Sequence, residues 1–249
     1  MSRGFYTLAS GMLTHQRKID ASSNNVANLN TAGYKKEQLV TSNFGSLLIN
    51  KYKQKGIKEE ATPINNVSMI RTVTENNTIH SQGALEETGN ITDFAIMGAG
   101  FFAVENDGQI LYTRNGSFNI DEEGYLILKG AGRVQGEFGE IFVGGDKFDF
   151  AEDGRILVDG EVIDNIAVYE FLDYNNLNKY GQGMFISDAE PDLVEYPYIR
   201  NKTIERSNVD PTEELTNIIS SQRALQTAAQ ALKIYDLIND QAVNEIGKI

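Results

Sequence analysis

The stretch FYTLASGMLTHQRKIDASSNNVANL, residues 5–29, decides how this chain folds. Its mostly apolar positions recur at alternating steps of three and four residues, which draws one stripe along a helix. The stripe consists of Phe5, Leu8, Met12, His15, Ile19, Ser22, Val26 and Leu29. Because a lone amphipathic helix gains stability by packing its apolar face on a partner, we expect this stripe to meet another helix. The partner is either the opposite end of the chain or another copy.

The C-terminal end repeats this pattern. Its stripe runs through Leu215, Ile218, Gln222, Leu225, Ala229 and Leu232, then slips by one residue and continues through Tyr235, Ile238, Ala242 and Ile246. Asp210 can cap the helix, Pro211 suits its first position and Glu213 completes a box-like arrangement. A helix from Pro211 to about Ile246 would be roughly 50 Å long, more than one compact domain needs.

Between these helices the pattern changes to short apolar runs separated by turn dipeptides. The dipeptides are Asp107-Gly108, Asn115-Gly116, Asp153-Gly154 and Asp159-Gly160, which predict β-hairpins. We expect strands at 101–104, 110–112, 118–120, 125–128, 141–143, 155–158, 162–171 and 183–186. The predicted fold class is therefore α+β, with long N- and C-terminal helices packing as a helical or coiled-coil assembly domain and an antiparallel all-β central domain inserted between them.

The domain division follows from the same patterns. Residues 1–35 and 205–249 are expected to form the terminal helical assembly domain, and residues 78–204 the central β domain. Residues 36–77 have weak periodicity and are read as an extended connector. Pro191 and Pro197 mark the return from the β domain toward the second helix.

Composition and charge limit the possible functions. The 249 residues include 41% hydrophobic residues, enough for a core, and neither cysteine nor tryptophan. Residues 1–60 carry nine Lys or Arg against four Asp or Glu, a balance of +5, whereas the remainder has a balance of -18. An acidic body argues against nucleic-acid binding, because phosphate recognition needs clustered basic charge. Charged residues interrupt the N-terminal stretch, so neither a cleaved signal peptide nor membrane insertion is expected.

The sequence offers little material for catalysis. His15 and His80 are the only histidines, too few for a histidine triad or metal cluster. The run Gly98-Ala99-Gly100 lacks the third glycine of a dinucleotide fingerprint. Acidic clusters at 121–124 and 152–154 lack the ligand spacing of a calcium loop and fit solvated hairpin turns. We therefore predict no catalytic residue, no cofactor and no metal, and a protein that is not an enzyme.

A family resemblance enters at the end of the first helix. The segment Asn24-Asn25-Val26-Ala27-Asn28-Leu29-Asn30-Thr31-Ala32-Gly33-Tyr34-Lys35 resembles the N-terminal signature of bacterial flagellar rod and hook proteins. Ser207-Asn208-Val209-Asp210 at the other end resembles the same family, as do Gly100-Phe101-Phe102 and the run from Tyr112 to Phe118. Hook proteins tend to carry extra outer domains, so the length favours a basal-body rod protein of the FlgG/FlgF type.

The resemblance implies a structural subunit of the flagellar basal-body rod, the axial drive shaft, which self-assembles through its terminal helices into a helical tube. Its implied partners are other copies of itself, other axial rod and hook proteins and the flagellar export apparatus. Its implied location is the basal body, reached by export without a cleaved signal peptide. In isolation, the ends are expected to be partly disordered and to order on assembly.

Two sets of residues are the predicted assembly site. The N-terminal set is Leu8, Met12, Ile19, Asn24, Asn25, Val26, Ala27, Asn28, Asn30, Thr31, Gly33 and Tyr34. The C-terminal set is Asn208, Val209, Leu215, Ile218, Gln222, Leu225, Ala229 and Leu232. The asparagines can donate and accept hydrogen bonds at the helix end or to neighbouring subunits.

Two other functions stay open at this point. An adhesin-like β-domain binding module could be oligomerised by its terminal helices, but a plain trimer should carry large apolar residues along both seams. The positions His15, Ser22, Gln222 and Ala229 instead suggest tight polar packing among many helices. An acid-dependent glycan hydrolase would need carboxylates in a pocket, and the chain has no tryptophan to serve as a sugar platform.

Overall fold

The computed structural model of the chain describes residues 3–55, 58–144, 148–151, 155–158, 161–181 and 183–246. These residues fall into two compact units. One, the helical unit, comprises residues 1–26, 37–78 and 210–249, and the other, the β unit, comprises residues 27–36 and 79–209. The residues that directly follow the N-terminal helix, 27–36, and those that directly precede the C-terminal helix, up to 209, therefore both belong to the β unit.

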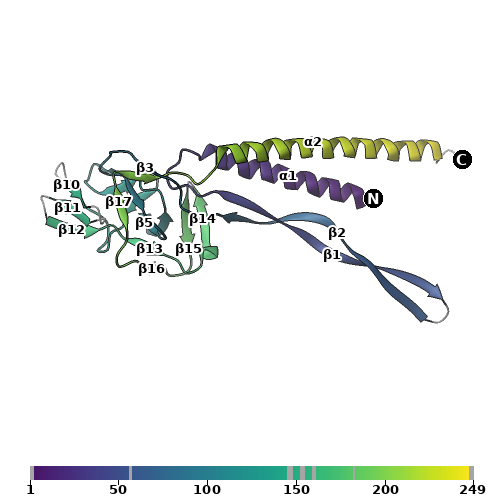
Figure 1. Cartoon of the computed structure of the whole chain (residues 1–249), viewed down its shortest axis with the longest axis horizontal. Coiled ribbons are helices and arrows are strands. Elements are labelled where there is room, and N and C mark those ends of the chain that lie inside the picture. The colour runs from purple at the N-terminus through teal and green to yellow at the C-terminus, as the bar shows by residue number, and fades with distance from the viewer. Residues whose placement is uncertain are drawn as a thin grey trace. The chain divides into compact units, whose positions relative to one another are not determined.

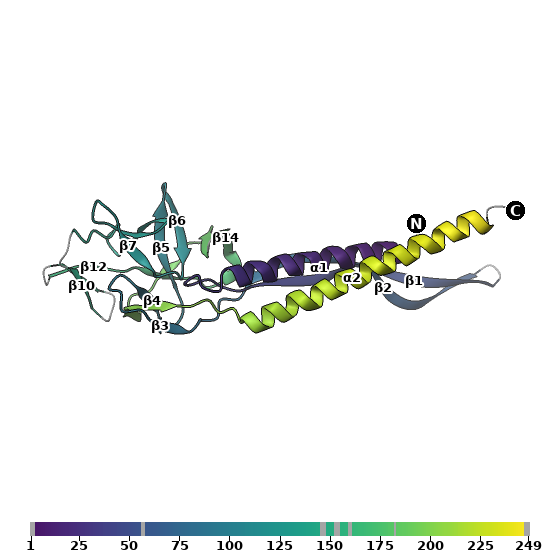
Figure 2. The ribbon, with the colours of Figure 1, turned by 90° about the horizontal axis from the view of Figure 1, so that it is seen from above.

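The helical unit contains α1 (Arg3–Ala27), α2 (Pro211–Gln241) and a short π-helical turn, Ala242–Ile246. The terminal helices pack together, as predicted, and run antiparallel (Figures 1 and 2). A methyl group built on Gly4 would lie 3.7 Å from Cε2 of Tyr235, so the start of α1 meets the last turns of α2. The predicted start of α2 is confirmed, because the carboxylate of Asp210 accepts hydrogen bonds from the backbone N–H groups of Thr212 and Glu213, with Pro211 at the first position.

The helical unit also holds two long paired strands, β1 (Glu37–Lys55) and β2 (Lys58–Thr78). They run antiparallel, with Glu37 opposite Thr78 and Lys55 opposite Lys58, and the register shifts at two places. Sequence patterning missed this pair because the segment lacks the alternation of apolar and polar residues that marks a half-buried strand.

The β unit is built on one large antiparallel sheet whose strand order is β14-β15-β6-β5-β9-β8-β7, with β13 pairing β5 and β16. Its strands are β5 (Phe101–Asn106), β6 (Gln109–Thr113), β7 (Phe118–Ile120), β8 (Leu126–Leu128), β9 (Gly132–Val134), β13 (Val168–Glu170), β14 (Leu177–Gly181), β15 (Met184–Ser187) and β16 (Asp192–Leu193). A 3-10 turn at Tyr174–Asn176 precedes β14. The predicted antiparallel central domain is thus confirmed.

Three smaller strand groups complete the unit. They are β10 (Phe148–Phe150) with β11 (Arg155–Val158) and β12 (Glu161–Asn165), β4 (Phe94–Ile96) with β17 (Ile199–Asn201), and β3 (Leu85–Glu87) with β18 (Thr203–Glu205). In the last two groups, a strand near the start of the β unit pairs with a strand near its end: β4 with β17, and β3 with β18.

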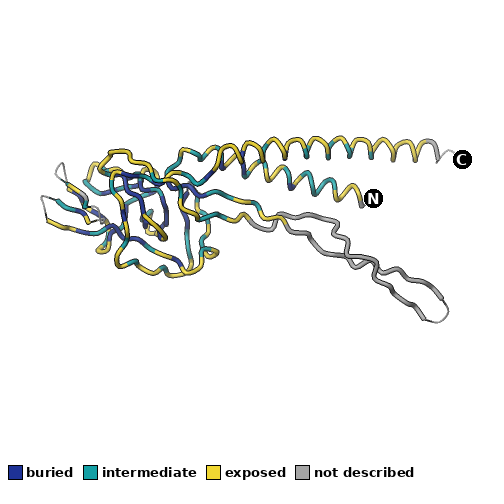
Figure 3. The backbone as a smooth tube through the Cα atoms, viewed as in Figure 1, coloured by how far each residue is buried: buried dark blue, intermediate teal, exposed yellow. Residues whose placement is uncertain are grey.

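The core of the β unit lies on both faces of β5. Phe102 and Val104 point into the main apolar cluster, whereas Phe101 and Ala103 point into a second one, because alternate strand residues face opposite sides. The Phe102 ring meets Phe118 edge-on at 5.2 Å between centroids. Buried positions cover much of this unit (Figure 3).

The predicted turns have mixed outcomes. Asp107 and Gly108 join β5 to β6 with φ values of 50° and 80°, as a tight hairpin of the primed type requires, so this prediction is confirmed. Asn115-Gly116 is not a hairpin turn, because β6 and β7 lie at different places in the sheet. Gly116 is needed there for close packing, since an added Cβ would lie 1.8 Å from the Phe94 carbonyl oxygen. Asp153-Gly154 and Asp159-Gly160 lie outside the described residues.

Candidate assembly site

The positions where the terminal helices are best covered are small or polar. On α1 the buried side chains are Thr14, Ser22 and Asn25, and on α2, over its described side chains, they are Glu214 and Ser221. The predicted stripe is partly right: Ile218, Leu225, Ala229 and Leu232 are half-buried, as are Leu8, Met12, His15, Ile19 and Val26. Leu215 and Gln222 are exposed instead, because the covered face of α2 passes one residue earlier, through Glu214 and Ser221.

Exposed positions run along both helices in Figure 3. Large apolar side chains are among them, although the two helices pack together. Their exposed fractions range from 37% to 72%. They are Phe5, Tyr6 and Leu13 on α1, Leu215, Ile219, Ile234, Leu237 and Ile238 on α2, and Val243 just beyond it. Exposed apolar groups gathered on one pair of helices mark an interaction surface, whereas single ones are ordinary.

Asn25 fastens the end of α1 to the start of β1. Its amide nitrogen donates to the carbonyl oxygen of Glu37 at 2.9 Å, and the backbone N–H of Glu37 donates to the Asn25 side-chain oxygen at 2.9 Å. This pair of bonds imitates the pairing of two strands. Asn28 and Thr31 then form the following turn, in which the Thr31 backbone N–H donates to the Asn28 carbonyl oxygen at 3.2 Å. Asn30 is exposed.

Gly33 allows the chain to pass close to the β sheet. Its φ is 67°, and an added Cβ would lie 2.2 Å from the backbone of Arg114 and Asn115. Its N–H donates to the Glu205 carbonyl oxygen at 2.7 Å. The next residue, Tyr34, is buried, and the ammonium group of Lys179 lies 4.6 Å above the centre of its ring.

A buried ion cluster lies directly after this aromatic residue. Lys35 Nζ lies 2.5 Å from Glu205 Oε1, and Arg114 Nη1 lies 3.3 Å from Glu205 Oε2, with all three side chains at most 4% exposed. Lys35 also donates to the Ser81 carbonyl oxygen at 2.8 Å, and Arg114 to that of Gly98 at 2.7 Å. Two cations therefore share one carboxylate, and the cluster joins the N-terminal segment, the sheet and the C-terminal segment.

This cluster shapes the protonation of its surroundings. Burial lowers the pKa of Lys35 and of Arg114, although attraction to Glu205 opposes this effect. Burial, together with the nearby charges of Lys35 and Arg114, lowers the pKa of His80 to about 4. The His80 ring stacks on Tyr174 at 5.0 Å between centroids and is therefore a neutral packing residue at pH 7.

Asn208, in the C-terminal segment, forms hydrogen bonds with Lys36 of the N-terminal segment and with residues 79–81. The backbone N–H of Lys36 donates to its side-chain oxygen at 2.7 Å, and its amide nitrogen donates to the carbonyl oxygens of Ile79 and Ser81 at 2.8 and 3.1 Å. Val209, which follows it, is buried. Asn208 and the ion cluster together hold residues 33–36 next to residues 205–208 within the β unit.

The structure thus divides the predicted site residues into two groups. Gly33, Tyr34, Asn208 and Val209 lie together in the β unit, where they hold its two connections. The other group lies along the helices. Its members are Leu8, Met12, Ile19, Asn24, Asn25, Val26 and Ala27 on α1, and Leu215, Ile218, Gln222, Leu225, Ala229 and Leu232 on α2. Asn28, Asn30 and Thr31 lie in the turn that follows α1, within the β unit. Sequence reasoning missed Glu205 and Arg114, which become partners of Lys35 only through the fold. It also missed Leu13, Ile219 and Ile234, because they fall outside the counted stripes.

Over the described part of the chain, no group of three or more His, Cys, Asp or Glu side chains could hold a metal ion. Among the described helices, none combines the length and apolarity required to span a bilayer. What the arrangement offers chemically is a set of apolar and polar surfaces on the two helices, which is the chemistry of association.

Comparison with known proteins agrees with this geometry. Three family models match: "Flagella basal body rod protein" over residues 5–35, "Flagellar hook protein FlgE/F/G D1 domain" over 95–166 and "Flagellar basal body rod FlgEFG protein C-terminal" over 200–245. The basal-body rod protein FlgG of Bacillus subtilis is 28% identical and aligns over 98% of this chain and 99% of its own length. FlgF of Caulobacter vibrioides is 29% identical over all of both chains, and the hook-basal body complex protein FlhO of Bacillus subtilis is 28% identical over all of both chains.

Paired terminal helices around an inserted antiparallel β domain define a structural protein of the bacterial flagellar axis, a family without enzymatic activity. Within that class, the chain belongs to the FlgG/FlgF family of flagellar basal-body rod proteins, and it is a structural subunit of the rod.

Proposed function

We propose that this rod subunit polymerises into a helical tube through the surfaces of α1 and α2. The observation that supports this most directly is the exposure of large apolar side chains on both helices after they have packed on each other, with Ile219 51% exposed and Leu237 62% exposed. Burying such side chains between copies is worth about 25 cal/mol per Å² of apolar surface removed from water.

The predicted assembly residues would have two roles in this proposal. Residues on the helices, such as Leu215 and Gln222, contact neighbouring copies because they are exposed. Residues of the N-terminal motif, such as Asn25 and Gly33, act within one chain by fixing where the helices begin and end relative to their connections. Under the proposed division, residues 1–35 and 205–249 form the inner assembly domain and residues 78–204 an outer β domain, joined through residues 36–77.

An open tube requires that one surface bind a different surface on the next copy through a rotation that does not close. The two helices suit this requirement, because α1 exposes aromatic residues at its start, Phe5 and Tyr6, whereas α2 exposes aliphatic ones. Partners of this subunit are then further copies and other rod and hook proteins, which carry similar terminal segments. The family relationship also supports delivery by the flagellar export apparatus.

The test compares two substitutions that add the same charge to α2. Ile219→Glu puts a carboxylate on the proposed contact surface, and Asn217→Glu puts one at an exposed position about 200° around the same helix, away from that surface. In cells that lack the native subunit, we expect Ile219→Glu to abolish swimming and rod completion and Asn217→Glu to support both. Rods and swimming at the native level with Ile219→Glu would contradict the proposal.

A further inference from the structure

Phe138 is an exposed aromatic residue on an anchored turn of the β unit. Its side chain is 85% exposed, at the tip formed by residues 136–139, where the backbone N–H of Gly136 donates to the Gly139 carbonyl oxygen at 2.6 Å. Gly139 has a φ of 128°, a conformation that glycine adopts without strain. Glu137, also exposed, precedes the ring in the sequence, and Glu140 follows it. Glu140 is paired with Arg133 at 2.8 Å, so Glu137 supplies the acidic charge that the tip can offer to a partner.

The backbone of the tip is hydrogen-bonded to a buried carboxylate. Asp164, 7% exposed, accepts backbone hydrogen bonds from Glu137, Phe138 and Asn165. Glu137 also donates its backbone N–H to the Asn165 carbonyl oxygen at 3.1 Å. A large aromatic ring held in water on a fixed backbone loses little conformational entropy when a partner covers it, which is the property of an interface anchor.

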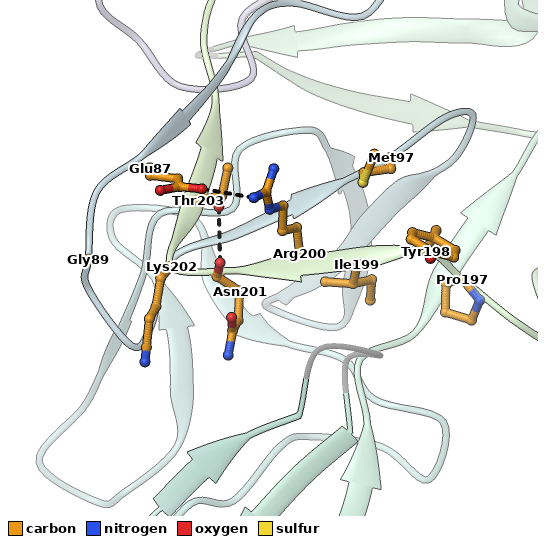
Figure 4. Close-up of a pocket in the computed structure, with 10 residues that line it drawn as sticks. All are labelled: Glu87, Gly89, Met97, Pro197, Tyr198, Ile199, Arg200, Asn201, Lys202 and Thr203. Atoms are coloured by element: carbon orange, nitrogen blue, oxygen red, sulfur yellow. Dashed lines mark hydrogen bonds and ion pairs between the residues drawn. The ribbon is translucent and has the colours of Figure 1, made fainter.

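A groove of about 780 Å³ lies elsewhere on the β unit, along β17 and the end of β4 (Figure 4). Met97 and Tyr198 lie toward one end of it and Lys202 at the other, with Arg200 between them. Met97 is 42% exposed and Tyr198 74% exposed, so the groove offers uncovered apolar surface. Its volume lies within the range of about 300–1,000 Å³ that is typical of binding pockets.

The groove is basic on an otherwise acidic body. Arg200 is paired with Glu87 at 2.8 Å, but the ammonium group of Lys202 has no partner among the described residues. Lys202 also has a φ of 53°, a conformation in which a non-glycine residue is uncommon and strained. An unpaired cation beside apolar surface therefore complements an aromatic ring next to the Glu137 carboxylate.

We propose that the Glu137-Phe138 tip of one copy docks in the Met97–Tyr198–Lys202 groove of a neighbouring copy, with the ring on Met97 and Tyr198 and the Glu137 carboxylate on Lys202. Tip and groove are different surfaces, so the contact is heterologous and continues from copy to copy. It forms a second, outer interface and deepens the proposed function, since it rests on polymerisation through the helices.

The absence of cysteine from the native chain allows a clean cross-linking test. Full-length chains carrying Glu140→Cys, two residues beyond the ring, are mixed with full-length chains carrying Tyr196→Cys, two residues before Tyr198, so that the docking residues stay intact. The mixture is assembled at high concentration and treated with a short bis-maleimide. The control mixture pairs Leu172→Cys with Tyr196→Cys, because Leu172 is 98% exposed and belongs to neither surface. We expect at least tenfold more mixed dimer from the first mixture than from the control.

Charge reversal then tests the orientation of the contact. Lys202→Glu in the groove copy should reduce the cross-link at least tenfold, and Glu137→Lys in the tip copy should restore it. Equal cross-linking at Leu172, dimers formed only between two Glu140→Cys chains, or no change on charge reversal would each overturn the inference. Unchanged melting of each variant alone verifies the fold.

The same mixtures distinguish this inference from the proposed function. If Ile219→Glu blocks assembly and native-helix polymers give no link between positions 140 and 196, the outer contact is wrong and helix-driven polymerisation stands. If Ile219→Glu chains assemble normally and give the link, the outer contact stands and the proposed role of the helices is wrong.

Discussion

The β unit has a buried apolar core, and the helical unit has none among its described side chains. In the β unit, Phe94, Phe102 and Phe118 are at most 1% exposed. In the helical unit, no apolar side chain is buried among those that the structure describes, and the buried positions of its helices are Thr14, Ser22, Asn25, Glu214 and Ser221. The β unit therefore carries the stability of the monomer, and we propose that the helical unit gains its stability from neighbouring copies.

The largest expected effect comes from breaking the ion cluster that fastens the two connections of the β unit. Glu205→Gln leaves Lys35 and Arg114 buried without a countercharge, which is expected to lower the free energy of unfolding by about 3–5 kcal/mol. Urea unfolding followed by circular dichroism measures the change. The matched control is Glu87→Gln, which removes an exposed partner of Arg200 and should change the free energy by no more than about 1 kcal/mol. Equal effects of the two substitutions would disprove the role of the cluster.

The next largest effect is expected at Gly33, the glycine of the N-terminal motif, which lies against the backbone of the β unit. Gly33→Ala forces a Cβ to 2.2 Å from the Arg114 backbone at a φ of 67°, and should destabilise the β unit by about 3 kcal/mol. Gly89→Ala is the control, because Gly89 has a φ of 77° and nothing within 4 Å of an added Cβ, so only about 1 kcal/mol is expected. Thermal unfolding of both variants measures the difference, and similar melting temperatures would show that the close approach is unimportant.

A smaller effect concerns pH. His80 has a pKa of about 4 in the folded chain and an ordinary value of 6.5 when unfolded. Above pH 6.5 the ring is neutral in both states, so it makes no difference there. As pH falls below 6.5, the unfolded chain binds the proton first, and the β unit should lose about 1–2 kcal/mol by pH 4, a value reduced for the partial exposure of the ring.

His80→Phe isolates this titration, because it removes the titrating group and keeps an aromatic ring against Tyr174 and Phe101. The variant's free energy of unfolding should decline less between pH 7 and pH 4 than that of the native chain. Parallel pH profiles for the two proteins would mean that His80 does not contribute to the acid sensitivity of the fold.

The smallest expected effect concerns an exposed apolar position of the helical unit. Ile238→Ala, at a position 57% exposed, should change the stability of the monomer by less than about 0.5 kcal/mol. The same substitution at Ile96, 2% exposed, should lower it by about 2–5 kcal/mol because it opens a cavity in the core. Comparable losses at the two positions, measured by urea unfolding, would remove the distinction between the units.

Local signals predicted the elements better than their contacts. Asp210 and Pro211 fixed the start of α2, and Asp107-Gly108 fixed one hairpin, because caps and tight turns depend on a few neighbouring residues. The seam of α2 was offset by one residue: the apolar count favoured Leu215, but the covered position is Glu214. A stripe of apolar residues marks what a helix buries in the whole assembly, and under the proposed polymerisation that includes surfaces of other copies.

Contacts between residues far apart in the sequence could not be predicted from it. Lys35 and Glu205 are 170 positions apart in sequence, so their pairing depends on the whole topology of the β unit. The long β1–β2 pair was missed for a different reason, since residues 36–77 show only weak periodicity in the sequence. The division into domains and the identity of the assembly residues remain predictions.

Amide hydrogen exchange of the full-length monomer, compared with that of polymerised subunits, tests the central claim most directly. The account predicts strong protection of β5 and β6 in both samples, and exchange in α1 and α2 at least 100-fold faster in the monomer than in the polymer. Helices in the monomer that exchange as slowly as β5 and β6, with no further slowing on polymerisation, would contradict it.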